Sequence, residues 1–169
     1  MITSFSRTIR RFLAAALSIA AAALLTGSVA KAQDMATITV PAGSIEFNVT
    51  DVTKNTPASN NPQTLGFTGA TFTGGDNSVQ FLLSAGGQYF SAGTGNGSIL
   101  SSIVQWKGTA TSGTGTVTTS SLNWPNAVVV YTGTGTQGGA NIWFRLKGPI
   151  TGISAGTYSL TVTWKVQGT

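Results

Sequence analysis

The last alternating run of the chain, residues 156–166, limits the possible folds more than any other stretch. Five apolar side chains fall on every second position, with polar residues between them: Tyr158, Leu160, Val162, Trp164 and Val166. This period of two predicts a β-strand with one buried face and one solvated face. Most of these residues are β-branched or aromatic, the types that are enriched in strands. We therefore predict that this strand is central to a β-rich core.

Shorter alternating runs precede it and are separated by turns rich in Gly, Asn and Pro. No run after residue 32 keeps a helical period over three turns. Many short strands with frequent turns predict an all-β fold, a single antiparallel β-sandwich. We expect strands at 36–40, 44–52, 65–73, 78–83, 99–107, 109–119, 126–131 and 141–147.

The first 32 residues have the features of an export signal. Three arginines precede an apolar run at 12–25, and Ala30 and Ala32 supply the small residues needed for cleavage before Gln33. The alternative is a retained membrane anchor, but an apolar run of about 14 residues is short for a span of roughly 20. We predict an exported protein with a signal peptide at 1–32, an N-terminal extension at 33–43 and a β-sandwich domain at 44–169.

The chemistry available to residues 33–169 is narrow. Five basic and four acidic residues remain there, a net charge of +1 without a basic cluster, so we expect no nucleic-acid binding. The chain has no Cys and no His, which excludes disulfides, triads built on those residues and the usual zinc sites. The acids are predicted at turns, at a solvated strand face and near the N-terminus: Asp34, Glu46, Asp51 and Asp76. We expect no enzyme, no metal and no cofactor, with a Ser–Lys pair as the remaining formal possibility.

Two tryptophans are candidates for surface recognition. Trp143 is predicted on the polar face of strand 141–147, and Trp124 lies in a loop at 122–126. Exposed indoles stack on sugars or anchor a protein partner. The alternative is that both side chains cap the ends of the sandwich as satellite core.

The C-terminal strand resembles that of chaperone–usher pilus subunits. Gly156 takes the place of a glycine that stands fourteenth from the end, and Val162, Trp164 and Val166 take the three alternating hydrophobic places. The penultimate residue is Gly168, where the family has an aromatic residue, and the common disulfide of those subunits is absent. The resemblance implies an immunoglobulin-like sandwich that lacks one strand and leaves a groove beside residues 158–166.

The resemblance also implies a mode of assembly. A periplasmic chaperone fills the groove first, and the N-terminal extension of the next subunit replaces it at an outer-membrane usher, by β-strand addition. The candidate donor strand is 36–40, and its groove-facing residues are Ala36, Ile38 and Val40. The alternative is that 36–40 pairs within its own domain as an ordinary first strand. Head-to-tail joining does not close on itself, so it builds a filament.

From these observations we predict an exported structural subunit of a cell-surface filament, a pilus or fimbria, whose main partners are other copies of itself. Two alternatives remain open. One is a secreted carbohydrate-binding or adhesin-like module that uses Trp124 and Trp143 as its glycan platform. The other is a coat or matrix protein whose sandwiches pack side by side without strand exchange.

Overall fold

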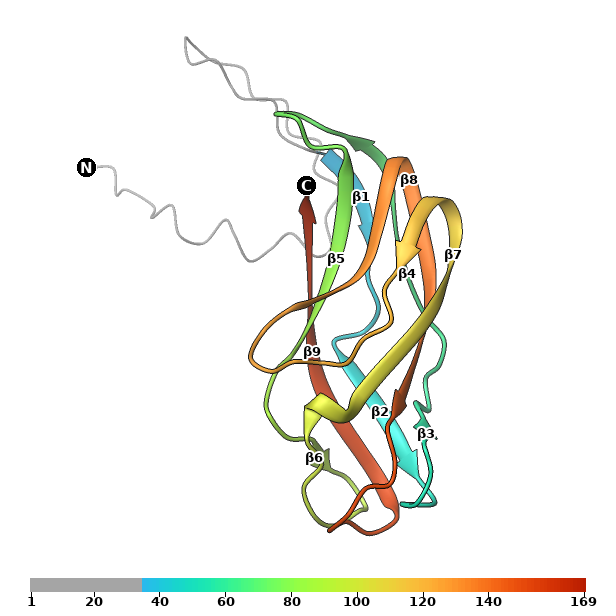
Figure 1. Ribbon diagram of the computed structural model, residues 1–169, viewed down its shortest axis with the longest axis vertical. Coiled ribbons are helices and arrows are strands. Elements are labelled where there is room, and N and C mark those ends of the chain that lie inside the picture. Colours follow the sequence, from blue (N-terminus) through green and yellow to red (C-terminus); the bar gives the residue numbers. More distant parts are fainter. Residues whose placement is uncertain (1–34) are drawn as a thin grey trace, which may run out of the picture. The chain divides into compact units, whose positions relative to one another are not determined.

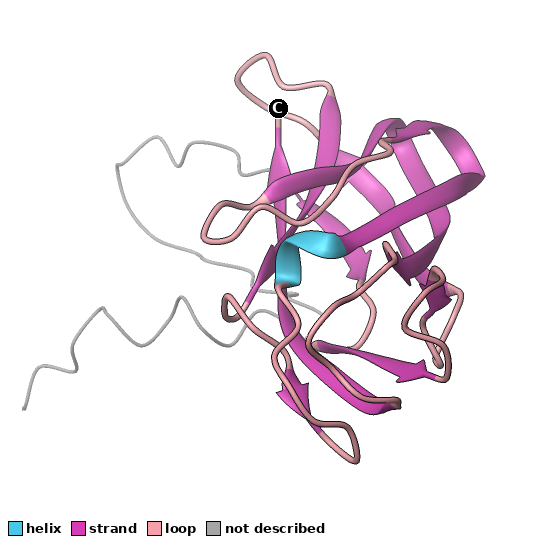
Figure 2. Cartoon of the chain, turned by 60° about the horizontal axis from the view of Figure 1, so that its bottom comes forward, coloured by secondary structure: helices cyan, strands magenta, loops and turns pink. Residues whose placement is uncertain are grey.

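The computed structural model describes residues 35–169 and is built almost entirely of antiparallel strands (Figure 1). The predicted signal peptide and Asp34 lie outside the described residues. In the described part the helical structure is one short 3-10 helix, η2 (Ser101–Ile103), seen in Figure 2. The predicted all-β, sandwich-like fold is therefore confirmed. The strands are β1 (Met35–Thr39), β2 (Ser44–Val49), β3 (Thr56–Pro57), β4 (Gln63–Thr71), β5 (Ser78–Ala85), β6 (Ser91–Ala92), β7 (Val104–Val117), β8 (Val128–Leu146) and β9 (Gly156–Gly168).

Strand β8 joins most of the sheet together. Strand β7 pairs along one edge of β8, from Tyr131 to Leu146. The opposite edge of β8 pairs in turn with β5 through 128–134, with β4 through 137–142 and with β3 through 145–146. The strand order is β1-β4-β8-β5-β9-β2, so β8 connects the β1–β4 pair to the β5–β9–β2 group.

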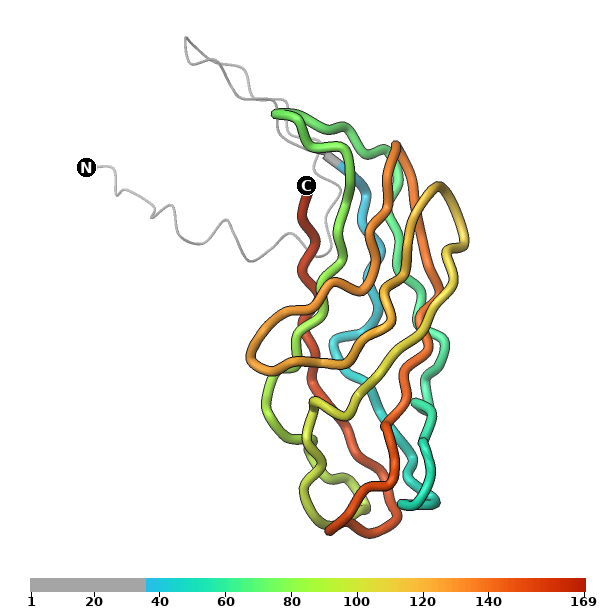
Figure 3. The backbone as a smooth tube through the Cα atoms, in the orientation of Figure 1, coloured from blue at the N-terminus to red at the C-terminus, as the bar shows by residue number. Residues whose placement is uncertain are grey.

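The sheet curls back on itself at one end. The Ala58 N–H donates to the Phe144 carbonyl of β8 at 3.0 Å, and the Ser59 N–H donates to the Glu46 carbonyl of β2 at 2.8 Å. Residues 56–59 thus connect β2 to β8 and complete the backbone pairing on this side. The tube in Figure 3 shows the same curl, with β2 returning beside the segment that contains β3.

The alternating stripes of the sequence form the core. Burial alternates strictly along β2, and the first half of β9 follows the same alternation from Tyr158 to Val162. A fully buried side chain of this size contributes about 1.5–3 kcal/mol of transfer free energy. The largest fully buried side chains come from six different strands and from two loops: Trp106, Tyr131, Tyr158, Phe47, Phe67, Phe81, Phe144, Ile45, Leu65, Leu83, Ile99 and Leu122.

Three glycines of β7 and β8 make room for one aromatic ring. A Cβ at Gly115 would overlap the Tyr131 hydroxyl, and one at Gly138 would lie 2.6 Å from it. A Cβ at Gly133 would lie 2.6 Å from the Phe67 ring and 2.9 Å from the Tyr131 ring. Glycine inside a strand often marks such a close approach. Burial also raises the pKa of the Tyr131 hydroxyl above its ordinary value.

Two predicted strands are one strand in the structure. Residues 126–131 and 141–147 were expected as separate elements, yet β8 runs without interruption from Val128 to Leu146. The residues between them absorb a bulge, because the ladder with β7 passes from Gly138 directly to Thr134. Gly135 has a φ of 83°, which glycine adopts without the steric cost that other residues carry. Likewise the predicted strands 99–107 and 109–119 become η2 followed by the single strand β7.

The packing around Tyr131 predicts the effect of a small substitution. Gly115→Ala is expected to lower the free energy of unfolding by about 1–3 kcal/mol, because its methyl group overpacks the Tyr131 slot. Gly87→Ala is the matched control, since its Cβ would meet its nearest neighbour at 3.8 Å. Urea unfolding of both variants measures the difference. Equal stability of the two variants would contradict the tight fit.

Candidate functional site

The first half of β9 is closed off by its own chain. Residues 156–161 pair with β2 on one edge, and Ser159 and Tyr158 pair with β6 on the other. The Tyr158 hydroxyl lies 2.7 Å from the Asn96 carbonyl and 2.8 Å from the Ser154 carbonyl, so two loops cover it. Three of the predicted groove residues, Tyr158, Leu160 and Val162, are therefore buried in the core. The expectation of an open groove beside these three residues is wrong, because β2 and Gly43 already occupy that edge of β9.

The second half of β9 has a different environment. Strand β5 pairs with it from Val162 to Gly168, with Phe81 opposite Val166 and Leu83 opposite Trp164. Directly opposite residues share a face of the sheet, so Trp164 and Val166 point toward the core side. Both are only partly buried, and the Trp164 Nε1 has no hydrogen-bond partner among the described residues.

Backbone directions show which edge of β9 is open. The Val162 N–H donates to the Gly43 carbonyl on the β2 side at 2.9 Å. Alternate residues of an antiparallel strand direct their N–H and C=O groups to the same side. The N–H groups of Trp164 and Val166 therefore point to the β2 side, where β2 has already ended at its pair Ser44–Thr161. No strand within residues 35–169 pairs with that edge beyond Val162.

The predicted donor segment is an edge strand in this structure. Met35–Thr39 forms β1 and pairs antiparallel with β4 of the same chain, with Ile38 opposite Phe67. Within the predicted extension, Met35–Thr39 is thus paired inside its own domain, which was the alternative arrangement for this segment. Phe67 is buried, so its partner Ile38 also faces the core side. No side chain from Ala36 to Val40 is buried, and Ile38 and Val40 are 38% and 37% exposed.

We call these two edges together the seam: the edge of β1 away from β4 and the edge of β9 from Trp164 to Gly168. The pairing of β1 with β4 ends at Thr39–Gly66. The chain then runs from Thr39 to Gly43, whose carbonyl accepts the hydrogen bond from Val162 of β9. Four residues span at most about 14 Å, so the two edges come close together at this crossing. The C-terminal half of β9 and strand β1 both continue from it toward the end of the molecule that holds the C-terminus (Figure 1).

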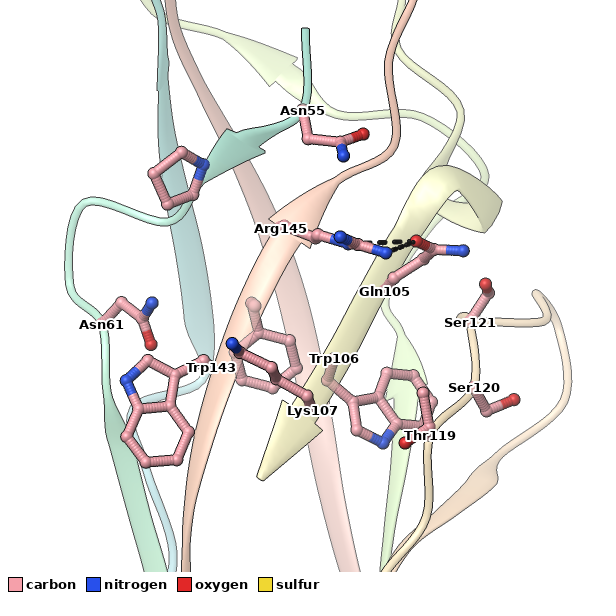
Figure 4. A pocket seen from close by; sticks show the side chains of 12 residues that line it. Asn55, Asn61, Gln105, Trp106, Lys107, Thr119, Ser120, Ser121, Trp143 and Arg145 are labelled. Carbon is pink, nitrogen blue, oxygen red and sulfur yellow. Dashed lines mark hydrogen bonds between the residues drawn. The ribbon is translucent and has the colours of Figure 1, made fainter. Parts of the chain in front are cut away.

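A second feature is a cleft of about 570 Å³ on the outer face of the sheet. Gln105 of β7 pairs with Arg145 of β8, and Lys107 pairs with Trp143, so these four side chains share one face. Trp106 and Phe144 also line the cleft, although their rings, with centroids 6.4 Å apart, belong to the core-facing residues of the same two strands. Figure 4 shows the lining residues: Asn55, Pro57, Asn61, Gln105, Trp106, Lys107, Thr119, Ser120, Ser121, Trp143, Phe144 and Arg145.

The two predicted recognition tryptophans are not brought together. Trp143 lines the cleft, whereas Trp124 is 43% exposed and is absent from the cleft lining. Sequence reasoning missed the residues around Trp143, although Arg145 and Lys107 stand on the polar faces of their strands. The missing information was the β7–β8 register, which places Gln105 beside Arg145.

The guanidinium of Arg145 is held in place by its neighbour. Its Nε–H and Nη2–H donate to Gln105 Oε1 at 3.1 and 2.9 Å (Figure 4). These bonds use two of the five N–H donors of the guanidinium. No Asp or Glu lines the cleft, so Arg145 and Lys107 give it a positive potential.

A turn between β2 and β3 fixes one wall of the cleft. Asp51 Oδ1 accepts hydrogen bonds from Thr53 Oγ1 at 2.6 Å and from the Thr53 N–H at 2.9 Å, and Lys54 Nζ lies 3.0 Å from Asp51 Oδ2. Asn55 then uses its Oδ1 to accept the Gly148 N–H at 3.0 Å, which leaves its NH₂ group for the cleft. Asp51 therefore has a turn-forming role.

Some kinds of site are not found in residues 35–169. No group of three or more potential ligands among Asp and Glu could hold a metal ion there. The same residues contain no helix that is long and apolar enough to cross a membrane.

The fold and the two features define an all-β protein with a curled antiparallel sheet, an open seam and a polar cleft. Comparisons with models of protein families, with curated proteins and with solved structures gave no match to this chain.

The Asp51 turn predicts a measurable titration. Bonds from the Thr53 hydroxyl, from Lys54 and from the Thr53 N–H lower the pKa of Asp51 from 3.8 to about 2. A lowered folded-state pKa means that this stabilisation is present above about pH 4 and is lost as the pH falls through about 2. Thr53→Val should raise the pKa of Asp51 in a carboxyl NMR titration. The neighbouring Thr50→Val should leave it unchanged, and an equal shift in both variants would contradict the assignment.

Proposed function

We propose that this chain is an exported structural subunit that assembles into a cell-surface filament by strand addition between copies at the seam. The observation that carries the proposal is the unpaired edge of β9 beyond Val162, next to core-facing apolar side chains that stay partly exposed. Export belongs to the same proposal and rests on the signal-like features of residues 1–32. Help from a periplasmic chaperone and an usher rests on the C-terminal resemblance.

Exposed strand edges favour further pairing. Natural proteins shorten, charge or cover such edges, because unpaired N–H and C=O groups recruit other strands. The open stretch of β9 carries one charge, Lys165, and no proline. An added strand would satisfy the outward N–H and C=O groups of Trp164 and Val166. It would also cover the half-buried side chains of those two residues.

Another copy of the chain supplies a suitable strand. Residues 36–40, which include most of β1, alternate Ala36, Ile38 and Val40 with two threonines, and this pattern matches a groove with one apolar face. Strand β1 is held to β4 by one edge, and none of its side chains from Ala36 onward is buried, so it is the strand that costs least to exchange. When β1 of one copy adds to the seam of the next copy, the two subunits contribute different surfaces to the interface. Such a head-to-tail interface does not close into a ring, so repeated addition gives a filament.

A proline placed on the open edge tests the seam. Val166→Pro removes an N–H that points away from β5, a position where edge strands tolerate proline. The variant is expected to stay folded by circular dichroism and to form no filaments in electron microscopy. Lys165→Pro is the comparison variant, because its N–H faces Leu82 of β5 and its replacement removes a ladder hydrogen bond, which should lower the free energy of unfolding. Filaments from Val166→Pro, or a wild-type chain that stays monomeric, would overturn the proposal.

Deletion of residues 34–41 tests the donor strand separately. None of the buried core side chains described for residues 36–169 lies in the deleted segment, so we expect the shortened chain to remain folded and to lose self-assembly. Sedimentation velocity and circular dichroism report the two properties. If the deletion unfolds a monomer instead, β1 is an ordinary structural strand and strand exchange is wrong. Filaments that dissociate in mild denaturant would favour side-by-side packing of a coat protein, since strand-exchanged polymers are kinetically trapped.

A further inference from the structure

We propose that the cleft around Trp143 binds an acidic saccharide, an oligosaccharide that carries a carboxylate such as a uronic acid. Trp143 serves as the stacking platform, and Arg145 and Lys107 receive the carboxylate. The cleft lies on the outer face of β7 and β8, so binding there is independent of strand exchange at the seam.

The shape and the aromatic wall suit a sugar. The volume of about 570 Å³ falls within the range of about 300–1,000 Å³ that is usual for small-molecule sites. Trp143 is partly exposed and stands beside Asn61 and Lys107 in Figure 4. An indole with one open side covers the apolar C–H face of a sugar ring and leaves the hydroxyl groups free for polar partners.

The charge of the lining favours a carboxylate. Its two cations, Arg145 and Lys107, are not opposed by any acid in the lining. Gln105 holds the Arg145 guanidinium through two hydrogen bonds, so less side-chain freedom remains to be lost when a ligand binds. The remaining N–H groups of Arg145 match the planar, paired oxygens of a carboxylate.

Two buried polar atoms of the cleft lining, Asn61 Oδ1 and Trp106 Nε1, lack a hydrogen-bond partner among the described residues. An unsatisfied buried acceptor such as Asn61 Oδ1 is unfavourable, and a ligand hydroxyl would satisfy it. The Asn55 NH₂ group and the hydroxyls of Ser120 and Ser121 line the same cleft and suit further sugar hydroxyls. A saccharide is the ligand class that offers many hydroxyls together with one carboxylate.

A nucleic acid fits the cleft less well. Neutralisation of a phosphate backbone needs several basic side chains along a path, whereas the cleft has two. The net charge of +1 for residues 33–169 gives no wider basic surface.

The test is a titration of the purified chain with trigalacturonate. Calorimetry measures the affinity, and NMR of the tryptophan indole protons reports which indole the ligand contacts. Neutral maltotriose and a short single-stranded oligonucleotide are the comparison ligands. We expect trigalacturonate to bind and to shift the Trp143 indole signal. Trp143→Ala and Arg145→Gln should each weaken its affinity about tenfold or more. Trp124→Ala, which removes an exposed indole outside the cleft, should leave the affinity unchanged.

Other outcomes would overturn the inference. These are equal binding of maltotriose, stronger binding of the oligonucleotide, no binding of any ligand, or full affinity in Arg145→Gln. An equal loss in Trp124→Ala would place the site elsewhere. Arg145→Lys separates charge from geometry: it should recover part of the affinity lost in Arg145→Gln, since it restores the charge but not the paired donors. Circular dichroism confirms that each variant is folded.

Discussion

The close approach of Tyr131 to three glycines is the constraint on which the rest of the sheet depends. Gly115, Gly133 and Gly138 have no Cβ, and a Cβ at these positions would overlap the Tyr131 ring or its neighbour Phe67. The absence of these Cβ atoms lets β7 pack along β8 while β8 changes partners on its other edge from β5 to β4. A chain with alanines at these positions would have to separate the strands that β8 connects.

Backbone pairing explains why the sheet is complete at one end and open at the other. Residues 56–59 connect β2 to β8, so hydrogen bonding there continues around the core. At the other end, residues 39–43 lead from β1, which pairs with β4, to β2, which pairs with β9. The free edges of β1 and of the C-terminal half of β9 therefore have no strand between them. The proposed assembly follows from this difference, because another copy can provide the missing backbone groups without disturbing the closed end.

The cleft and the seam lie on different strands and use different faces of the sheet. Core-facing side chains of β1 and β9 meet at the seam, whereas outward-facing side chains of β7 and β8 line the cleft. In a filament the cleft would be repeated in every subunit. Weak sites that are held in a row bind a polymeric ligand more tightly than one site does, provided their spacing allows simultaneous contact. A structural role and a saccharide-binding role are therefore compatible in one chain.

The sequence by itself determined the all-β class and the buried stripes, because a period of two in apolar residues is a local property of a strand. The runs at 36–40, 78–83 and 156–166 each lie within or overlap a strand of the structure. Only the tertiary structure decided that 126–131 and 141–147 are one strand, since the bulge at Gly135 depends on pairing with β7. Pairing also decided that Met35–Thr39 joins β4 and that β2 covers Tyr158. The partners of Trp143 depend on the register between β7 and β8, and residues some forty positions apart carry no local signal of that register.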